Sequence, residues 1–426
     1  MRTNSLFSSK KSHITTAINV IMIVFSMKTL YDIIKNGYYA IKNNNIWSLH
    51  EFYINYQGGF IRRGLFGEII YQFCLLTGAN PQFIVGIICI FCFIFVIYTF
   101  FIIFKKNGIK WWILPLSIFL ASLDVVRKDF IFITNLILIL YTYRSSIPIW
   151  LKVLIINIIV IFTILSHEAF FFVCVPFLTL LFLRDKKTIP SFTLRVAACL
   201  PIWFAMFVVS RHHGDLASAN VIQQSWANII PNWDSNLPFD DSTNNYAGSI
   251  GALAWTTEYA AKLHFSINFL YTSLRIPGYI IRPIAIILLF YFTLNYIKYF
   301  SSNNTHNRTH LFFNIFLFQF LSLLPMFTIL SCDTRRICFY WFSSSFAFYL
   351  ILSEDILIRL FHYWYHTFTL KIQTLGCKLL PSNKTITLFL VFLVCAPYSG
   401  NNIVNAITSN VIMQYVRIII DFLNIL

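Results

Sequence analysis

Charged residues are scarce in this chain of 426 residues: they make up 11% of it, and only 16 are aspartate or glutamate. Soluble domains carry roughly 25% charged residues, so the sequence excludes an ordinary soluble protein. Hydrophobic residues account for 58% of the chain. Several apolar runs, such as 83–104 and 311–330, are long enough to cross a bilayer. Continuous runs of this kind predict an all-α membrane protein rather than a barrel.

The sequence also lacks the signatures of nucleotide and metal sites. It contains no P-loop and no Rossmann glycine fingerprint. Cys89 and Cys92 form a C-x-x-C pair, but no second pair completes a zinc site. We therefore expect no metal and no cofactor. The net charge of +16 indicates basic cytoplasmic loops rather than a nucleic-acid partner.

The pattern of apolar runs predicts a single membrane-embedded domain, residues 1–426, with about 11 or 12 transmembrane helices. The first segment has a basic start but no small-residue cleavage site, which favours a retained helix over a signal peptide. Residues 36–80 are expected to form the first periplasmic loop, and residues 211–277 a large periplasmic loop. Single spans are expected at 14–34, 81–104, 192–209, 279–296, 385–397 and 403–426.

Three further runs, 111–143, 149–183 and 311–352, carry charges near their middle. A charge at the bilayer centre costs about 2.5–3.5 kcal/mol, whereas a turn between two helices avoids this cost. We therefore expect three hairpins with their charges at the turns, near 124–129, 166–168 and 332–336. If the N-terminus is cytoplasmic, all three turns lie on the outer side. Several of these half-hairpins are short for a bilayer of ~30 Å, which predicts turns recessed in a cavity.

Two adjacent arginines, Arg62 and Arg63, lie in the glycine-rich sequence G-G-F-I-R-R-G-L of the first outer loop. Glycines such as Gly59 and Gly64 let the backbone approach a ligand closely. Paired arginines beside exposed backbone N–H groups suit a phosphate. The alternative is a loop whose arginines hold lipid headgroups at the interface.

The hairpin turns add further cations to the outer face. Arg127 and Lys128 belong to the first turn, and Arg335 and Arg336 to the third. Ionisable residues at membrane depth are functional candidates, so we predict that these four side chains bind an anionic substrate together with the arginine pair of the first loop.

The same turns supply groups for proton transfer. Glu168, beside His167, is the first candidate for a general base, and Asp129 and Asp333 follow. The alternatives are structural. His167 could only orient Glu168 or fill a polar pocket, and Asp333 could pair with Arg336, three residues further on.

The large loop combines the tryptophans Trp226, Trp233 and Trp255 with carboxylates and amides. This composition suits stacking and hydrogen bonding to sugar rings. An interfacial amphipathic helix with tryptophan at headgroup level would have the same composition.

These features suit displacement of a lipid-linked diphosphate by a sugar hydroxyl, because arginines stabilise the leaving anion and a carboxylate takes the proton. With its many spans, outer arginines and Phe/Ile-rich composition, the chain resembles the O-antigen polymerases (Wzy), and more loosely the GT-C glycosyltransferases. The segments that carry the resemblance are G-F-I-R-R-G-L (59–65), R-K-D (127–129), H-E (167–168) and D-T-R-R (333–336).

The resemblance implies an enzyme of the bacterial inner membrane whose active site faces the periplasm. Such an enzyme transfers a growing glycan from undecaprenyl diphosphate to the next lipid-linked repeat unit and uses no nucleotide sugar. The implied partners are the undecaprenyl-diphosphate-linked oligosaccharide, membrane lipid, and a chain-length regulator and flippase of the same pathway.

Three other functions stay open. A GT-C enzyme usually carries an acidic motif in its first outer loop, where this chain offers only Glu51 and Glu68 and no D-D or E-x-D pair. A flippase or transporter for lipid-linked sugars commonly shows two similar halves, and the sequence shows no such repeat. An O-acetyltransferase would need a histidine and acids near the path of an acyl donor, for which His167 is the only good histidine candidate.

Overall fold

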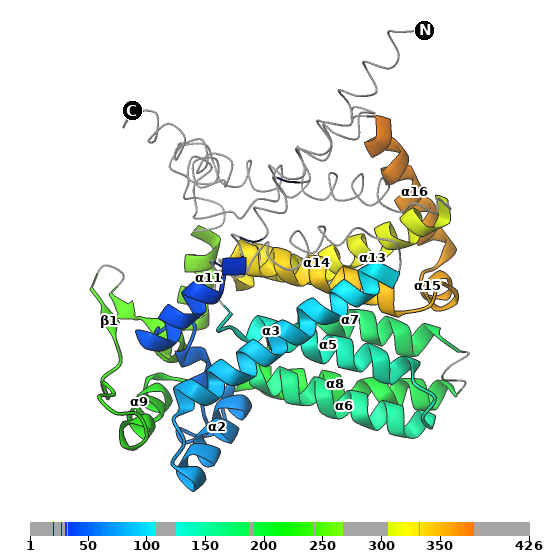
Figure 1. Cartoon of the computed structure of the whole chain (residues 1–426). Helices are drawn as coiled ribbons and strands as arrows, with labels where there is room; N and C mark the ends of the chain where they lie inside the picture. The colour runs from blue at the N-terminus through cyan, green and yellow to red at the C-terminus, as the bar shows by residue number, and fades with distance from the viewer. Residues whose placement is uncertain are drawn as a thin grey trace, which may run out of the picture.

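The computed structural model describes residues 33–106, 125–186, 191–241, 244–266, 306–331 and 333–378, together with a few isolated positions. These residues confirm the all-α class. The strands they contain are the two-residue strands β1 (Phe239–Asp240) and β2 (Asn245–Tyr246), which pair antiparallel. Figure 1 shows the long helices running side by side as a bundle. Four of the described helices are long and apolar enough to cross a membrane, or five if one bent pair counts as a single span.

Two predicted single spans are confirmed. Helix α3 (Pro81–Lys106) matches the span expected at 81–104, and α8 (Phe192–Arg211) matches the span expected at 192–209. Both expose large apolar side chains on the outside of the bundle, including Phe83 on α3 and Phe204 on α8, as expected of helices that face lipid. The spans predicted at 279–296, 385–397 and 403–426, and most of 14–34, lie outside the described residues.

The predicted hairpins are also found where the structure describes them. Helix α6 (Ile149–Ser166) turns into α7 (Ala169–Arg184) at residues 167 and 168. Helix α13 (His306–Pro325) continues as a π-helical turn, η6 (Met326–Leu330), before α14 (Thr334–Ile351) begins. Helix α5 (Lys128–Arg144) lies where the second arm of the remaining hairpin is expected, and the segment expected to form its first arm lies outside the described residues.

The arms of these hairpins are short. Helix α7 has 16 residues, about 24 Å at 1.5 Å per residue, which is less than the ~30 Å hydrocarbon core. Helix α7 is therefore shorter than a full-length span. The cavity expected around the turns remains a prediction.

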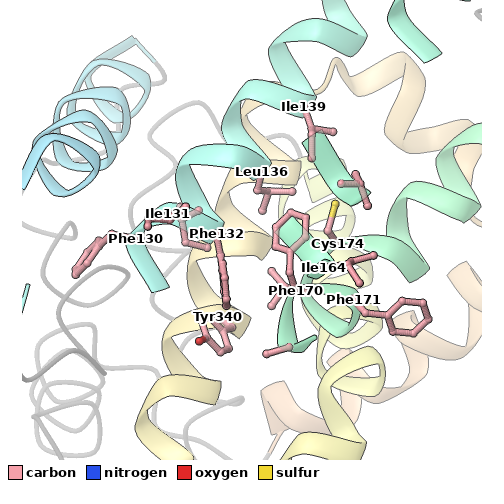
Figure 2. Close-up of a cluster of buried hydrophobic side chains, with 14 of the residues drawn as sticks. Phe130, Ile131, Phe132, Leu136, Ile139, Ile164, Phe170, Phe171, Cys174 and Tyr340 are labelled. Atoms are coloured by element: carbon pink, nitrogen blue, oxygen red, sulfur yellow. The ribbon is translucent and has the colours of Figure 1, made fainter. Parts of the chain in front are cut away.

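Aromatic side chains fill the space between α5, α7 and α14. Figure 2 shows Phe132 of α5, Phe170 of α7 and Tyr340 of α14 pointing toward one another, and the ring of Phe132 lies 5.7 Å and 5.8 Å from the other two. Phe132 also packs against the imidazole of His167, at 5.4 Å. This apolar cluster therefore packs directly against the turn between α6 and α7.

The two loops predicted to lie on the outer side, within 36–80 and 211–277, fold together as one cap on the described bundle. The first loop contains η1 (His50–Tyr53) and α2 (Gly64–Thr77), an apolar helix of 14 residues that the sequence did not predict. The large loop contains α9 (Leu216–Ser225), η3 (Trp226–Asn228), α10 (Gly248–Gly251), η4 (Ala252–Ala254) and α11 (Thr257–Phe265). In Figure 1, α9, β1 and α11 gather at one end of the bundle, and α15 (Glu354–Leu360) and α16 (Tyr363–Lys378) lie at the other.

Hydrogen bonds between distant residues hold the cap together. The indole of Trp226 donates to the carbonyl of Tyr53 at 2.8 Å, and the N–H of Arg62 donates to the carbonyl of His212 at 2.9 Å. Ser249 donates through its N–H to Ile46 and through its hydroxyl to the carbonyl of Trp47. The large loop therefore fixes the position of the first loop and, with it, the backbone of the arginine pair.

Candidate functional site

Charged side chains from five separate segments meet where the cap joins the bundle. They come from η1, from the loop before α2, from the start of α5, from the turn between α6 and α7, and from the start of α14. We call this group the charge network; its members are Glu51, Arg62, Arg63, Lys128, Asp129, His167, Glu168 and Arg336. Each member contacts another member, or a main-chain atom of one, at the distances given below.

Arg63 and Glu168 are joined by three hydrogen bonds. The Nε of Arg63 donates to both carboxylate oxygens of Glu168, at 3.0 Å and 2.8 Å, and its Nη2 donates to Oε1. Burial of Glu168 raises its pKa, but the charge and hydrogen bonds of Arg63, together with the charge of Arg62, outweigh this effect and hold the pKa well below its ordinary value. The Glu168 carboxylate is therefore ionised at neutral pH and is a weak proton acceptor in this arrangement.

The side chain of Arg62 makes fewer polar contacts than that of Arg63. Its Nη1 lies 3.7 Å from Oε1 of Glu168, too far for a hydrogen bond. Its Nε is buried and has no hydrogen-bond partner within the described part of the chain. Burial and the charge of Arg63 lower the pKa of Arg62, and Glu168 partly offsets them. Arg62 thus carries unsatisfied capacity for an anion.

Glu51 joins two arms of the network. Its Oε1 accepts a hydrogen bond from Nε2 of His167 at 2.9 Å and lies 3.3 Å from Nη2 of Arg336. Only 2% of Glu51 is exposed. Burial raises the pKa of Glu51, yet Arg336 and His167 more than compensate and hold it well below the ordinary value.

His167 is held as a neutral imidazole. The N–H of Ala169 donates to its Nδ1 at 3.1 Å, which assigns the ring proton to Nε2. Nδ1 also lies 3.5 Å from Glu168, but two acceptors cannot form a hydrogen bond, so this contact is no ion pair. Burial and the charge of Arg63 lower the pKa of His167. Both ring nitrogens are engaged, so His167 orients its neighbours.

Arg336 is the counterpart of Arg63 on the other side of the network. Its Nε lies 3.1 Å from both carboxylate oxygens of Asp129, and its Nη2 lies 2.8 Å from Oδ1. The hydroxyl of Tyr340, four residues further along α14, also donates to Asp129. Asp129 is 1% exposed, so it holds Arg336 from the buried side of the network.

Lys128 binds main-chain oxygens. Its ammonium donates to the carbonyl of Ser166 at 2.9 Å and approaches the carbonyl of Arg63 at 3.5 Å. It also lies 5.7 Å from the centre of the Phe52 ring, within the range of a cation–π contact. With 1% of its surface exposed, Lys128 ties the α6–α7 turn to the first loop.

The backbone of the first loop is shaped to present the arginines. Arg63 has φ +68°, a left-handed conformation unusual for a residue with a side chain, and α2 begins directly after it. A Cβ on Gly64 would meet the Tyr56 ring at 2.3 Å, so a side chain there would displace the loop. Glu68 accepts from the N–H of Tyr56 at 2.8 Å and closes the loop on itself.

The network is closed on one side and open on the other. Glu51, Lys128 and Asp129 are at most 2% exposed. The side chains of Arg62, Arg63, Glu168 and Arg336 are between 18% and 25% exposed. The accessible edge therefore presents three guanidinium groups and one carboxylate, a surplus of positive charge that attracts an anion.

Some predicted site residues take other positions. Asp333 caps α14 by accepting the N–H of Arg336 at 3.3 Å, which is a structural contact. Arg127 precedes α5 as its N-cap residue. The side chain of Arg335 lies outside the described residues. Gly59 has φ +98° and supplies a turn three residues before Arg62.

Sequence reasoning missed two members of the site. Glu51 is the one carboxylate in the mostly apolar run around η1, and a buried carboxylate requires a partner. Tyr340 lies four residues after Arg336, on the same face of its helix. The sequence contains both features, but neither feature predicts which residue the side chain contacts.

The tryptophans of the large loop divide into two groups. Trp226 and Trp233 are buried, and their indole N–H groups donate to main-chain carbonyls, so they stabilise the cap and do not present a face for sugar stacking. Trp255 is only partly buried and lies 6.1 Å from Trp47, which is 44% exposed. Among the described tryptophans of the cap, this second pair is therefore the accessible one.

Within the described residues, no group of three or more His, Cys, Asp or Glu side chains is arranged to hold a metal ion. The chain matches no protein-family model, no curated protein and no solved structure. The candidate function therefore depends on the geometry of the charge network and on the chemistry that its side chains support.

Proposed function

We propose that this protein is a membrane glycosyltransferase of the O-antigen polymerase type, which joins undecaprenyl-diphosphate-linked repeat units at the periplasmic face of the bacterial inner membrane. The observation that carries the proposal is the open edge of the charge network. It combines Arg62, Arg63 and Arg336 with one reachable carboxylate, Glu168, at the end of an apolar bundle that can hold a lipid tail.

In the proposed reaction, the acceptor hydroxyl oxygen forms a bond to the anomeric carbon of the donor sugar. The bond from that carbon to the diphosphate oxygen breaks, and its electron pair leaves with the lipid diphosphate. Arg62 and Arg63 stabilise the negative charge that develops on this leaving group. The hydroxyl proton passes to the carboxylate of Glu168.

Glu168 is the preferred proton acceptor because the other candidates are enclosed or engaged elsewhere: Asp333 caps α14 through the N–H of Arg336. Asp129 is 1% exposed and is bonded to Arg336 and Tyr340. Both nitrogens of His167 are occupied. Glu168 is the carboxylate on the open edge, and its neighbours in the network hold Arg63 and the α6–α7 turn in position around it.

In the proposed reaction, the acceptor glycan rests on an aromatic surface of the cap. Trp47 and Trp255 form an accessible aromatic pair, and the indole of Trp255 is fixed by a hydrogen bond of 2.8 Å to the carbonyl of Tyr246. Fixed aromatic faces suit the apolar faces of sugar rings. Trp47 lies four residues before Glu51, so this surface and the charge network share one short segment of chain.

Lipopolysaccharide profiling of a deletion strain tests the proposal. We expect the deletion to leave lipid A core plus a single repeat unit, and the wild-type gene to restore the ladder. Glu168→Gln should fail to restore it, although the protein reaches the membrane in normal amount. The matched control is Glu258→Gln, because Glu258 is an exposed cap residue that pairs with Lys262, four residues further along α11; this variant should restore the full ladder.

Two results would contradict the proposal in different ways. A normal ladder in the deletion strain would end the polymerase assignment. Loss of even the single-unit band would favour a flippase or an earlier transferase of the same pathway.

A further inference from the structure

The Arg63–Glu168 contact raises a question about the proposed site. Nε and Nη2 of Arg63 form the fork with which arginine binds a phosphate, and in this structure both donate to Glu168. Arg63, the residue best placed to bind the diphosphate, is thus bonded to Glu168, the residue best placed to accept a proton.

The carboxylate of Glu168 is chemically similar to one face of a phosphate group. Each presents two anionic oxygens to the same two N–H donors. Arg62 lies beside this contact, 3.7 Å from Oε1 of Glu168, and its buried Nε has no partner within the described residues. An incoming diphosphate would therefore find one guanidinium with free capacity next to one that is filled by an internal anion.

We propose that Glu168 occupies the position of one phosphate group in the empty site, and that a lipid diphosphate displaces it from Arg63. Arg62 is the first contact of the incoming anion, and Arg63 becomes the second when Glu168 leaves. The closed side of the network stays in place during this exchange, because Lys128 holds the carbonyls of Ser166 and Arg63 and Glu51 holds His167.

Displacement has a consequence for catalysis. While it is bonded to Arg63, Glu168 is a weak base; once the diphosphate neutralises the two arginines, the carboxylate regains a higher proton affinity. The base therefore becomes competent only when the donor is bound, which prevents unproductive chemistry at an empty site. This inference rests on the proposed function.

Direct binding measurements test the displacement. Purified full-length protein in nanodiscs is titrated with farnesyl diphosphate, a short prenyl diphosphate, at pH 7. Removing the internal competitor by Glu168→Gln should tighten binding roughly tenfold, equivalent to about 1.4 kcal/mol. Glu168→Asp keeps the charge but withdraws it by one methylene, and should give a smaller gain. Glu258→Gln, the exposed control, should bind as the wild type does.

The possible outcomes separate this inference from the proposed function. Unchanged or weaker binding by both Glu168 variants would overturn the displacement and show that Glu168 only positions Arg63, even if the wild type binds the ligand and makes polymer. No binding by the wild type or by any variant would overturn both the displacement and the diphosphate site. Tighter binding by Glu168→Gln, or by Glu168→Asp if the first variant does not fold, supports the displacement.

Discussion

The two ends of the helix bundle use arginine differently. At the end that carries α15 and α16, three arginines bind main-chain carbonyls near helix C-termini, and Arg359 binds the fully buried carboxylate of Asp185. Arg144 donates to the carbonyl of Ile351 at 2.5 Å, Arg184 to that of Leu360 at 3.3 Å, and Arg195 to that of Leu183 at 2.8 Å. At the cap end, Arg63 and Arg336 bind carboxylates, and the carboxylate that Arg63 binds, Glu168, has a side chain that is 18% exposed.

This difference separates a structural role from an exchangeable one. Carbonyls at a helix C-terminus lack partners within the helix and carry partial negative charge, so a basic side chain there satisfies them permanently. A partly exposed carboxylate such as Glu168 can move away when another anion arrives, whereas a fully buried one such as Asp185 has no such freedom. The comparison therefore predicts that substitutions at the cap end reduce activity and that substitutions at the other end reduce mainly stability.

The largest contrast is expected between Arg63→Ala and Arg184→Ala. Loss of Arg63 removes the fork for the diphosphate and leaves Glu168 without its main counter-charge, so polymer formation should fall by about 100-fold or more. Arg184→Ala should leave the ladder normal, since Arg184 bonds to the carbonyl of Leu360 at the other end of the bundle and to no member of the charge network among the described contacts. The measurement is ladder intensity divided by the amount of membrane-inserted protein. Equal losses in both variants would remove the distinction between the two ends.

The second contrast uses a buried carboxylate from each end. Glu51→Gln should reduce polymer formation by about 10- to 100-fold, because Arg336 and His167 lose the group that aligns them. Asp185 is fully buried and bonds to the hydroxyl of Tyr143 at 2.9 Å and to Arg359 at 3.1 Å. Asp185→Asn should lower the free energy of unfolding by about 1–3 kcal/mol, with activity per folded molecule unchanged.

Two measurements decide this contrast: thermal unfolding of the detergent-solubilised protein, and polymer yield per folded molecule. Glu51→Asp, which keeps the charge, should recover part of the lost activity if Glu51 acts by orienting the other two side chains. If Glu51→Gln is as unstable as Asp185→Asn, and Glu51→Asp recovers no activity, Glu51 serves the fold alone.

The hairpin plan of the bundle could be predicted from the sequence because its cause is local. Charges in the middle of an apolar run are expensive inside a bilayer, so the turn at residues 167 and 168 follows from the run itself. Helix α2 could not be predicted in the same way. It begins immediately after a glycine-rich loop and is shorter than a span, and its stability depends on packing against η1 and α6.

The membership of the charge network was largely predictable, but its pairing was not. Arg62, Arg63, Asp129, His167, Glu168 and Arg336 were all predicted as site residues. Nothing in the sequence indicates that Arg336 pairs with Asp129, 207 residues away, rather than with Asp333 nearby. Contacts over such separations depend on how the helices pack, and a single sequence contains no direct record of that packing.

The third prediction concerns pH. The pKa values of Glu51 and Glu168 are lowered in the folded protein. Their contribution to stability is therefore fully present above the ordinary carboxyl pKa of 4.5 and is lost as the pH falls through the lower folded values. The unfolding temperature of the wild type should fall as the pH drops below about 4.5, and Glu51→Gln should show a shallower decline. Identical pH profiles would place the titrating groups elsewhere.

The smallest expected effect comes from two glycines that share a backbone conformation. Gly59 has φ +98° and Gly78 has φ +66°, and a Cβ on either would meet no atom within 4 Å. Alanine at each should therefore lower the free energy of unfolding only by the backbone strain of about 1–2 kcal/mol.

Gly78 ends α2, where its N–H bonds to the carbonyl of Cys74, far along the helix from the arginines. Gly59 precedes them by three residues. Strain relieved by a small shift of the first loop would move Arg62 and Arg63, so Gly59→Ala should lower polymer yield several-fold at a loss of stability equal to that of Gly78→Ala. Equal yields from the two variants would mean that the loop tolerates such movement, and that the position of the arginines is set by Glu168 and the large loop alone.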